Sequence, residues 1–274
     1  MSTITPYEKL TFSNDFLFCK ILETKTELCK ELVELIFGRK VKEIRNVRSQ
    51  FSLKQTVKGK GVRFDIIFED EVNSIYDFEM QTTDTHNLPK RSRYYQAMID
   101  TSAIEQGIDY EDLPQSYIVF ICTFNPFESG RHLYTFTNLC IEEPALSLGD
   151  KTQKVFLCTE GDKEDVSSEI MDFLDYVAGR KLEGKIAKEL DAEVKNAREK
   201  EEWRAEYMQN MAAIMDAKRE GHKEGIIQGG NNMLYELVQD GSISIDVASK
   251  KMGVSKKEFE NKMNLCGYKQ PKRT

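Results

Sequence analysis

The sequence predicts an α/β fold, a mixed β-sheet flanked by helices, followed by a long helical extension. Two alternating apolar stretches, 61–69 and 75–81, enclose a polar turn and indicate a β-hairpin. The continuous apolar run SYIVFICTF at 116–124 is typical of a strand buried on both faces. A segment at 182–238, rich in Glu, Lys, Ala, Met and Arg and without proline, indicates long helices.

The first helix is predicted over residues 13–38, where apolar side chains recur at helical spacing. Ser13 is placed to cap its start, and Gly38 is typical of a helix end. A strand-like stretch follows from about Val41 to Val57, before the hairpin. A further helix and two further strands are expected after the hairpin, at 88–106, 132–142 and 153–159. Helices interleaved with paired and buried strands favour a mixed sheet.

Beyond the segments predicted to form the sheet, the sequence pattern becomes helical throughout. An amphipathic helix is expected at 166–178, and the helical segment at 182–238 carries apolar side chains spaced as one stripe. Because this stripe cannot form a core alone, we expect it to pack on another subunit or on the domain. Gly221, Gly225 and Gly229 either align on one helix face or break the helix. We divide the chain into a core, a helical arm that mediates oligomerisation and a C-terminal segment, at 8–160, 161–238 and 239–274.

Residues 242–263 have the pattern of two short helices joined by a glycine turn. Ser255, with a glutamate three residues later, forms a capping box at the start of the second helix. In a helix-turn-helix, that second helix would bring Lys256 and Lys257 to DNA. A plain helical hairpin used for packing explains the pattern equally. Residues 241–274 hold eight Lys and Arg against three Asp and Glu, a balance that suits contact with phosphates.

The composition argues against several classes of protein. The six cysteines lie far apart without a CxxC pair and the three histidines are scattered, which indicates reduced thiols and argues against a zinc site. No apolar stretch approaches the roughly 18 residues of a membrane span. The first residues have neither the basic nor the apolar segment of a secretory signal. We therefore expect a cytoplasmic protein that does not bind membranes.

The hairpin sequence GVRFDIIFEDEVNSIYDFEMQ, residues 61–81, carries polar side chains on otherwise apolar strands. Side chains alternate between the two faces of a strand. This alternation places Val62, Phe64, Ile66 and Phe68 on one apolar face of the first strand. Asp65 is expected on the opposite face, and Asp77, Glu79 and Gln81 share one face of the second strand.

Two interpretations of these acids remain open. On a solvated face they would form salt bridges with the arginines nearby, Arg63, Arg91 or Arg93. Alternatively, Asp65 and Glu79 converge from neighbouring strands on one hard cation, which takes oxygen ligands. Metal-assisted phosphodiester cleavage also needs a polar group that orients water, and Gln81 lies beside Glu79 on the same face. For Asp77 we expect a solvated position or one behind the ligands.

The segments RFDIIFED and IYDFEMQ resemble the D…(E/D)-x-K/Q core of the PD-(D/E)XK nucleases. More narrowly, the chain resembles the Rpn family of recombination-promoting nucleases, which are also described as transposases. FSNDFLFCKIL resembles that family's N-terminal helix, LPKRSRYYQAMID its helix after the hairpin, and YIVFICTFNPF its central strand. The similarity covers about residues 8–160, and a charged helix followed by a helix-turn-helix-like segment is also common in that family.

The resemblance implies a restriction-endonuclease-like core and Mg²⁺-dependent DNA endonuclease activity, with Mn²⁺ as an alternative metal. Asp65 and Glu79 would be metal ligands and catalytic residues, and Gln81 would be the catalytic residue that replaces the usual Lys. Asp15 would approach the metal directly or through water, although an acid in the first helical turn also complements the helix dipole. Recombination and defence against foreign DNA are both roles of this scaffold.

Four further side chains lie near the predicted site. Arg91 and Tyr95, four residues apart on one helix face, would neutralise the phosphate or brace the carboxylates. Arg93 falls off that face, because it is two residues from Arg91. His86 lies in the loop beside the hairpin and could act as a base, but a surface position explains it as well.

Two other functions stay open. A non-catalytic DNA-binding or regulatory protein would keep the nuclease fold, and the amide at Gln81 motivates this alternative. A helical oligomerisation scaffold is suggested by the charged arm. DNA is the expected partner, together with a second copy of the chain, because many restriction-type nucleases cut two strands by pairing two sites. The helical arm is the expected interface of that dimer or higher oligomer.

Overall fold

The computed structural model describes residues 5–54, 60–104, 107 and 109–269. The chain divides into two compact units, Met1–Ala205 and Glu206–Thr274. The first unit contains the sheet, and the second contains the C-terminal helices. In the part of the chain that the structure describes, no helix is long and apolar enough to cross a membrane.

The first unit is built on a six-stranded mixed sheet with the strand order β1-β2-β3-β4-β6-β5. Its strands are β1 (Ile44–Leu53), β2 (Val62–Asp70), β3 (Ile75–Gln81), β4 (Ser116–Cys122), β5 (Leu133–Phe136) and β6 (Thr152–Cys158). β1, β2 and β3 are antiparallel neighbours, β3, β4 and β6 are parallel, and β5 runs antiparallel to β6. Every residue of β4 is buried, as its continuous apolar sequence predicts.

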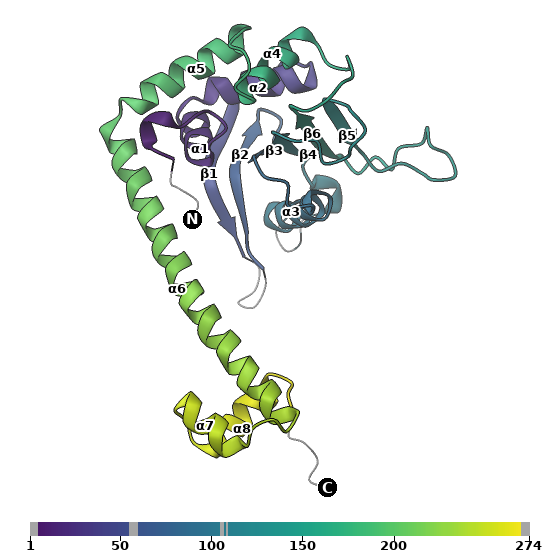
Figure 1. Cartoon of the computed structure of the whole chain (residues 1–274). Coiled ribbons are helices and arrows are strands. Elements are labelled where there is room, and N and C mark those ends of the chain that lie inside the picture. Colours follow the sequence, from purple (N-terminus) through teal and green to yellow (C-terminus); the bar gives the residue numbers. More distant parts are fainter. Residues whose placement is uncertain (1–4, 55–59, 105–106, 108, 270–274) are drawn as a thin grey trace. The chain divides into compact units, whose positions relative to one another are not determined.

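Helices cover both faces of this sheet (Figure 1). The α-helices are α1 (Asp15–Thr24), α2 (Thr26–Phe37), α3 (Leu88–Ala103), α4 (Ser168–Val177) and α5 (Lys185–Arg198). α3 packs on one face, where its buried side chains join those of β2, β4 and β6. α1 and α2 pack on the other face, and α4 and α5 pack against them. The predicted α/β class, with a mixed sheet between helices, is therefore confirmed.

The single helix predicted over 13–38 is wrong, because two helices meet at Lys25. The backbone of Lys25, with φ −123° and ψ 72°, leaves the helical region. Asn14, rather than Ser13, caps α1, since its side chain accepts a hydrogen bond from a backbone N–H of the first turn. Gly38 ends α2 in the left-handed region with φ 62°, as predicted.

The alternation predicted for β2 holds only in part. Phe64 and Ile67 pack in the same apolar cluster with α3, although they are an odd number of residues apart. The strand therefore changes face between them, at Asp65 and Ile66. The predicted common face of Val62, Phe64, Ile66 and Phe68 is wrong for this reason. The pairing of β2 with β3 ends at the same point.

Other elements differ from the prediction mainly in length. β1 is shorter than the predicted stretch at 41–57, whose last three residues lie outside the described residues. The strand predicted over 132–142 ends at Phe136. The apolar stripe at the start of the predicted arm lies in α5 and is buried within the first unit, so this part packs on the domain. For this reason the units divide after Ala205 and not near residue 160 or 238.

The second unit contains most of α6 (Glu201–Gln239) together with α7 (Ile245–Met252) and α8 (Lys256–Leu265). α6 continues through Gly221, Gly225 and Gly229, so these glycines do not break the helix. A Cβ atom at each of them would meet no heavy atom within 4 Å, which means that the unit itself does not use them for close packing. The small core of the unit is formed by Tyr235, Val238, Ala248, Phe259 and Met263.

The turn between α7 and α8 matches the sequence prediction. Gly253 lies in the left-handed region with φ 71° and ends α7. Ser255 caps α8, because its Oγ accepts a hydrogen bond from Glu258 N at 3.2 Å. Lys256 pairs with Asp246, and both lysines proposed as DNA contacts are exposed. A helix-turn-helix and a packing hairpin both remain compatible with this arrangement.

Candidate active site

Strands β2 and β3 separate where the acidic residues lie. Their ladder pairs Ile66–Glu69 with Ile75–Phe78 and goes no further, although both strands continue. Beyond the last pair, Asp65 N donates to Glu79 Oε1 at 2.9 Å, and Met80 N donates to Asp65 Oδ2 at 3.1 Å. Side-chain carboxylates thus replace the missing ladder bonds. Each carboxylate is held by the backbone of the opposite strand, which gives a rigid acidic pair.

The acidic pair is buried, which excludes the solvated sheet face. Asp65 is 7% exposed and Glu79 is 0% exposed. Burial, followed by the charges of Glu79 and Asp15, raises the pKa of Asp65. Burial also raises the pKa of Glu79, although Arg91 opposes this shift. A divalent cation would relieve the repulsion between these carboxylates.

Arg91 from α3 connects the residues of the second strand. Its guanidinium donates to Gln81 Oε1 at 2.9 Å through one terminal nitrogen and to Glu79 Oε2 through the other. Gln81 Nε2 also donates to Glu79 Oε2, at 3.4 Å. The guanidinium also lies over the ring of Phe120 on β4. The distance from Arg91 Cζ to the centroid of that ring is 5.6 Å. The Gln81 amide is therefore fixed between an acid and a cation.

Tyr95 completes this network from the same helix face, as its spacing from Arg91 predicts. Arg91 Nε donates to the Tyr95 hydroxyl at 2.9 Å, and that hydroxyl donates to Arg63 O at 3.4 Å. Burial and the charge of Glu79 raise the pKa of Tyr95, so its phenol stays protonated at neutral pH. Tyr95 thus ties α3 to β2 next to the acids.

Asp15 reaches the same place from the first turn of α1. One carboxylate oxygen of Asp15, one of Asp65 and the sulfur of Cys19 lie within 4.8 Å of one another. Asp15 Oδ2 also accepts from Arg63 at 3.2 Å. Glu79 is outside this group of potential ligand atoms, and its two oxygens accept hydrogen bonds from Asp65 N and Arg91. The two aspartates offer hard oxygen donors, which fit Mg²⁺ or Mn²⁺ better than a soft metal.

Cys19 is a neighbour of the site that the sequence pattern did not predict. Its thiol donates to Asp65 O at 3.2 Å, and burial with the nearby Asp65, Asp15 and Glu79 charges raises its pKa. The thiol is therefore neutral and supports the Asp65 backbone rather than acting as a nucleophile. The sequence spacing could have indicated this role, because Cys19 follows Asp15 by four residues and both therefore lie on one face of α1.

We expect Cys19 to resist alkylation in the native protein. Iodoacetamide should label the exposed Cys266 first and label Cys19 only after unfolding, because the Cys19 thiol is buried and neutral. Peptide mass spectrometry of a labelling time course measures both rates, and Cys266→Ser removes the fast label as a control. Rapid native labelling of Cys19 would contradict the placement of its side chain.

Asp65 opens onto a cleft of about 590 Å³ with a cationic lining. Asp65 lies in its wall together with four basic side chains, those of Lys60, Arg63, Lys90 and Arg91. Tyr94 closes one side, where its hydroxyl donates to Lys60 O at 2.6 Å. A cleft in which cations surround the carboxylate of Asp65 suits a polyanionic substrate.

The remaining residues near the hairpin take no direct part in this cleft. Asp77 is completely buried on the α3 side, so the solvated position expected for it is wrong. Burial and the charges of Glu79 and Asp65 raise its pKa well above the ordinary range. His86 is exposed and pairs with Asp84 at 2.9 Å. Arg93 lines a different cavity, as its position on the helix predicts.

The fold and the acidic pair define a PD-(D/E)XK nuclease-type α/β core. The family described as PD-(D/E)XK nuclease family transposase matches residues 12–224, and the chain belongs to that family. This match includes the hairpin, α3 and the helices up to the first part of α6. Comparison with curated proteins and with solved structures gives no match.

Proposed function

We propose that this protein is a divalent-metal-dependent endonuclease that hydrolyses phosphodiester bonds of DNA. The observation that carries the proposal is the separation of β2 and β3, which holds Asp65 and Glu79 as a rigid acidic pair and places Asp65 in the wall of a cationic cleft. Membership of a nuclease family supports the same chemistry. Recombination and defence against foreign DNA are both biological roles that such an activity could serve.

Asp15 and Asp65 are the residues that would hold the cation, and Glu79 would join them by exchanging its contact with Arg91 for the cation. When bound, Mg²⁺ or Mn²⁺ would act as a Lewis acid at the scissile phosphate. Arg91 fixes the orientation of Glu79 and Gln81 before substrate arrives, which is the preorganisation that positioning residues provide. The Gln81 amide can orient a water or a phosphate oxygen, but it cannot take up a proton as a lysine amine can.

Plasmid nicking tests this function. Purified protein is incubated with supercoiled plasmid in Mg²⁺, in Mn²⁺ or in EDTA, and nicked and linear products are separated by electrophoresis. We expect cleavage with either metal and none in EDTA. A protein that binds the plasmid but cuts it under none of these conditions would overturn the endonuclease proposal.

The second candidate function is a non-catalytic DNA-binding or regulatory protein. The observation that favours it is the Arg91 contact to Glu79 Oε2, which leaves one of the predicted ligands paired with a cation. Such a protein would retain its DNA affinity after loss of Asp65. Electrophoretic mobility shifts in EDTA, measured beside the nicking assay, distinguish it from an enzyme.

We also propose that Lys256 and Lys257 on α8 contact DNA phosphates. Their joint replacement with glutamine should lower DNA affinity and reduce the slope of log K against log salt by about 0.9 for each phosphate that is no longer neutralised. Fluorescence anisotropy at several salt concentrations measures this slope. The matched control replaces Lys250 and Lys251 on α7, which removes the same charge from the same unit. Equal effects of the two pairs would rule out a specific role for α8.

We propose that two copies of the chain associate through α6. This helix exposes several large apolar side chains, and Ile226 and Ile227 are each 63% exposed. Sedimentation velocity at micromolar concentration should show a dimer or a higher oligomer, and Ile226→Glu with Ile227→Glu should dissociate it. Val72→Glu with Tyr110→Glu, at two exposed apolar positions outside α6, is the control for added charge. A monomeric wild-type protein would contradict the proposal.

A further inference from the structure

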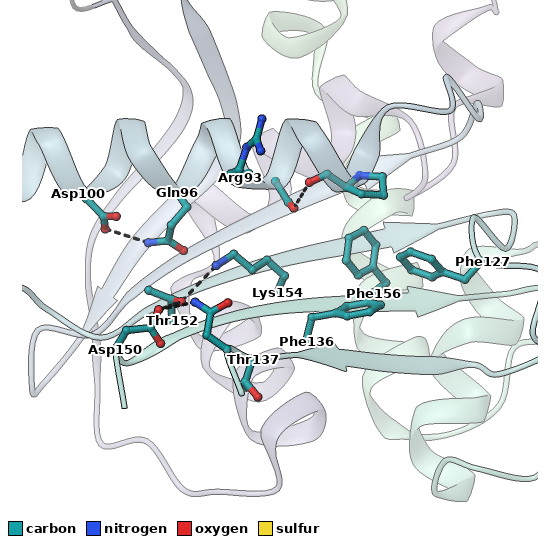
Figure 2. Close-up of a pocket in the computed structure, with 13 residues that line it drawn as sticks. Arg93, Gln96, Asp100, Phe127, Phe136, Thr137, Asp150, Thr152, Lys154 and Phe156 are labelled. Atoms are coloured by element: carbon teal, nitrogen blue, oxygen red, sulfur yellow. Dashed lines mark hydrogen bonds between the residues drawn. The ribbon is translucent and has the colours of Figure 1, made fainter. Parts of the chain in front are cut away.

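A second cavity, of about 510 Å³, lies beside α3, between this helix and strands β5 and β6 (Figure 2). It shares no lining residue with the cleft at Asp65. Its volume falls within the range of about 300–1,000 Å³ that is typical of small-molecule sites. One end of the cavity is aromatic and the other end is polar, and the two ends suit different parts of one ligand.

The aromatic end is formed by Phe127, Phe136 and Phe156. The ring centroids of Phe127 and Phe136 lie 5.0 Å apart, and both rings stand nearly perpendicular to the ring of Phe156. Phe156 is buried, whereas Phe136 is 43% exposed on the short edge strand β5. A partly exposed phenyl ring in a cavity wall offers a stacking surface to a planar ligand.

The polar end contains a buried acceptor without a donor. Gln96 on α3 is 7% exposed, and its Nε2 donates to Asp100 Oδ1 at 2.8 Å and to Ser116 Oγ at 2.6 Å. Gln96 Oε1 is buried and has no hydrogen-bond partner among the described residues. Figure 2 shows Gln96 and Asp100 directed from α3 toward the strands. A ligand N–H at this place would satisfy an acceptor that is otherwise costly to bury.

Lys154 on β6 supplies a donor opposite these acceptors. It extends from the strand toward α3 in Figure 2, and its Nζ donates to Thr152 Oγ1 at 3.2 Å. Burial lowers the pKa of Lys154, while the nearby charges of Asp150 and Asp100 oppose this shift. An ammonium carries three donors, so further N–H groups remain for a ligand oxygen. Asp150 is held by Asn138 and Thr152, at 2.6 and 2.9 Å.

We propose that this cavity binds a nucleobase, with guanine as the preferred base. The ring would stack at the phenylalanine end, its keto oxygen would accept from Lys154, and its N1–H and amino group would donate to Gln96 Oε1 and Asp100. Adenine presents an amino group where guanine has the keto oxygen, so it would place a donor against the Lys154 ammonium. The site goes beyond the proposed nuclease activity and does not depend on it.

The same base chemistry has two sources, a free nucleoside or nucleotide and a base of a DNA strand turned out of its stack. Isothermal titration calorimetry of the full chain with deoxyguanosine and deoxyadenosine in EDTA tests the first source. Deoxyguanosine carries no phosphate, so the cationic cleft at Asp65 does not contribute and failure of the nuclease proposal would not affect the result. We expect deoxyguanosine to bind at least about tenfold more tightly than deoxyadenosine.

Two variants connect this binding to the cavity. Phe136→Ala, on an exposed edge, and Lys154→Met, which keeps the side-chain length, should each weaken deoxyguanosine binding by at least about tenfold. Tyr110→Ala is the matched control, because Tyr110 is an exposed aromatic side chain outside the cavity. Circular dichroism of each variant confirms that it is folded. Unchanged binding by the folded Lys154→Met protein would overturn the assignment.

The second source is tested with a short single-stranded oligothymidylate, with and without one central guanine, in EDTA. A gain in affinity from the guanine that disappears in Phe136→Ala identifies the DNA strand as the source. Deoxyguanosine binding without such a gain identifies a free nucleoside or nucleotide. If deoxyguanosine does not bind and guanine adds nothing to the oligonucleotide, the proposal is wrong. Equal binding of deoxyguanosine and deoxyadenosine would overturn the preference for guanine.

Discussion

Replacing Asp65 with asparagine should reduce plasmid cleavage by at least about 1,000-fold, which corresponds to about 4 kcal/mol of transition-state stabilisation. The asparagine keeps the shape of the side chain and can still accept from Met80 N, but it loses the charge that would hold a cation. The free energy of unfolding should not fall. Burial and the charges of Glu79 and Asp15 already disfavour a carboxylate at this position.

The rate of plasmid nicking in Mg²⁺ and a urea unfolding curve measure the two parts of this result. Asp112→Asn, an exposed acid away from the cleft, is the matched control and should cleave at the wild-type rate. Cleavage that persists in Asp65→Asn would indicate a contaminating nuclease or a different site. A large loss of stability would mean that Asp65 serves the fold rather than the chemistry.

Replacing Arg91 with methionine should destabilise the first unit by about 3 kcal/mol. The change leaves Glu79 fully buried without its cation, and breaking a buried pair by removing one partner typically costs about 3–5 kcal/mol. We expect a loss at the lower end of this range because the pKa of Glu79 is already raised. Glu79 can therefore take up a proton in the variant, which avoids part of the cost of a buried charge. Cleavage should fall as well, since Gln81 loses the donor that fixes its amide.

Urea unfolding followed by near-ultraviolet circular dichroism measures this loss. The double variant Glu79→Gln with Arg91→Met should recover most of the stability, because the buried acid and its half-buried cation are removed together. Arg93→Met is the matched control, since Arg93 lies on the same helix outside the acidic network, and it should change stability by less than about 0.5 kcal/mol. An equal effect of Arg91→Met and Arg93→Met would show that the Glu79 contact contributes nothing.

Local patterns in the sequence predict the hairpin and much of its chemistry. Alternation and a polar turn are enough to place β2 and β3, and they assign Asp77, Glu79 and Gln81 to one strand. Helical spacing is enough to place Arg91 and Tyr95 on one face, where the structure shows them hydrogen-bonded. These features depend on neighbours within one element or one hairpin.

The sequence prediction fails where distant segments decide the outcome. The change of face at Asp65 depends on the side-chain bonds between two separating strands, which no period describes. Asp77 is buried because its side chain faces α3. The sequence does not predict this burial, because acidic residues usually lie at the surface. The helical spacing of apolar residues continues across Lys25, so the sequence does not predict that the helix ends there. The separation into α1 and α2 accompanies the packing of both helices on the sheet. Cys19 joins the site through the contact of α1 with β2.

Binding of Mn²⁺ tests most directly whether the hairpin acids form a metal site. Electron paramagnetic resonance of free Mn²⁺ is titrated with wild-type protein and with Asp65→Asn, without DNA, so that the measurement does not depend on activity. We predict a wild-type Mn²⁺ site that Mg²⁺ displaces and that Asp65→Asn loses. Equal Mn²⁺ binding by the two proteins, or none by the wild type, would contradict a metal site at Asp65.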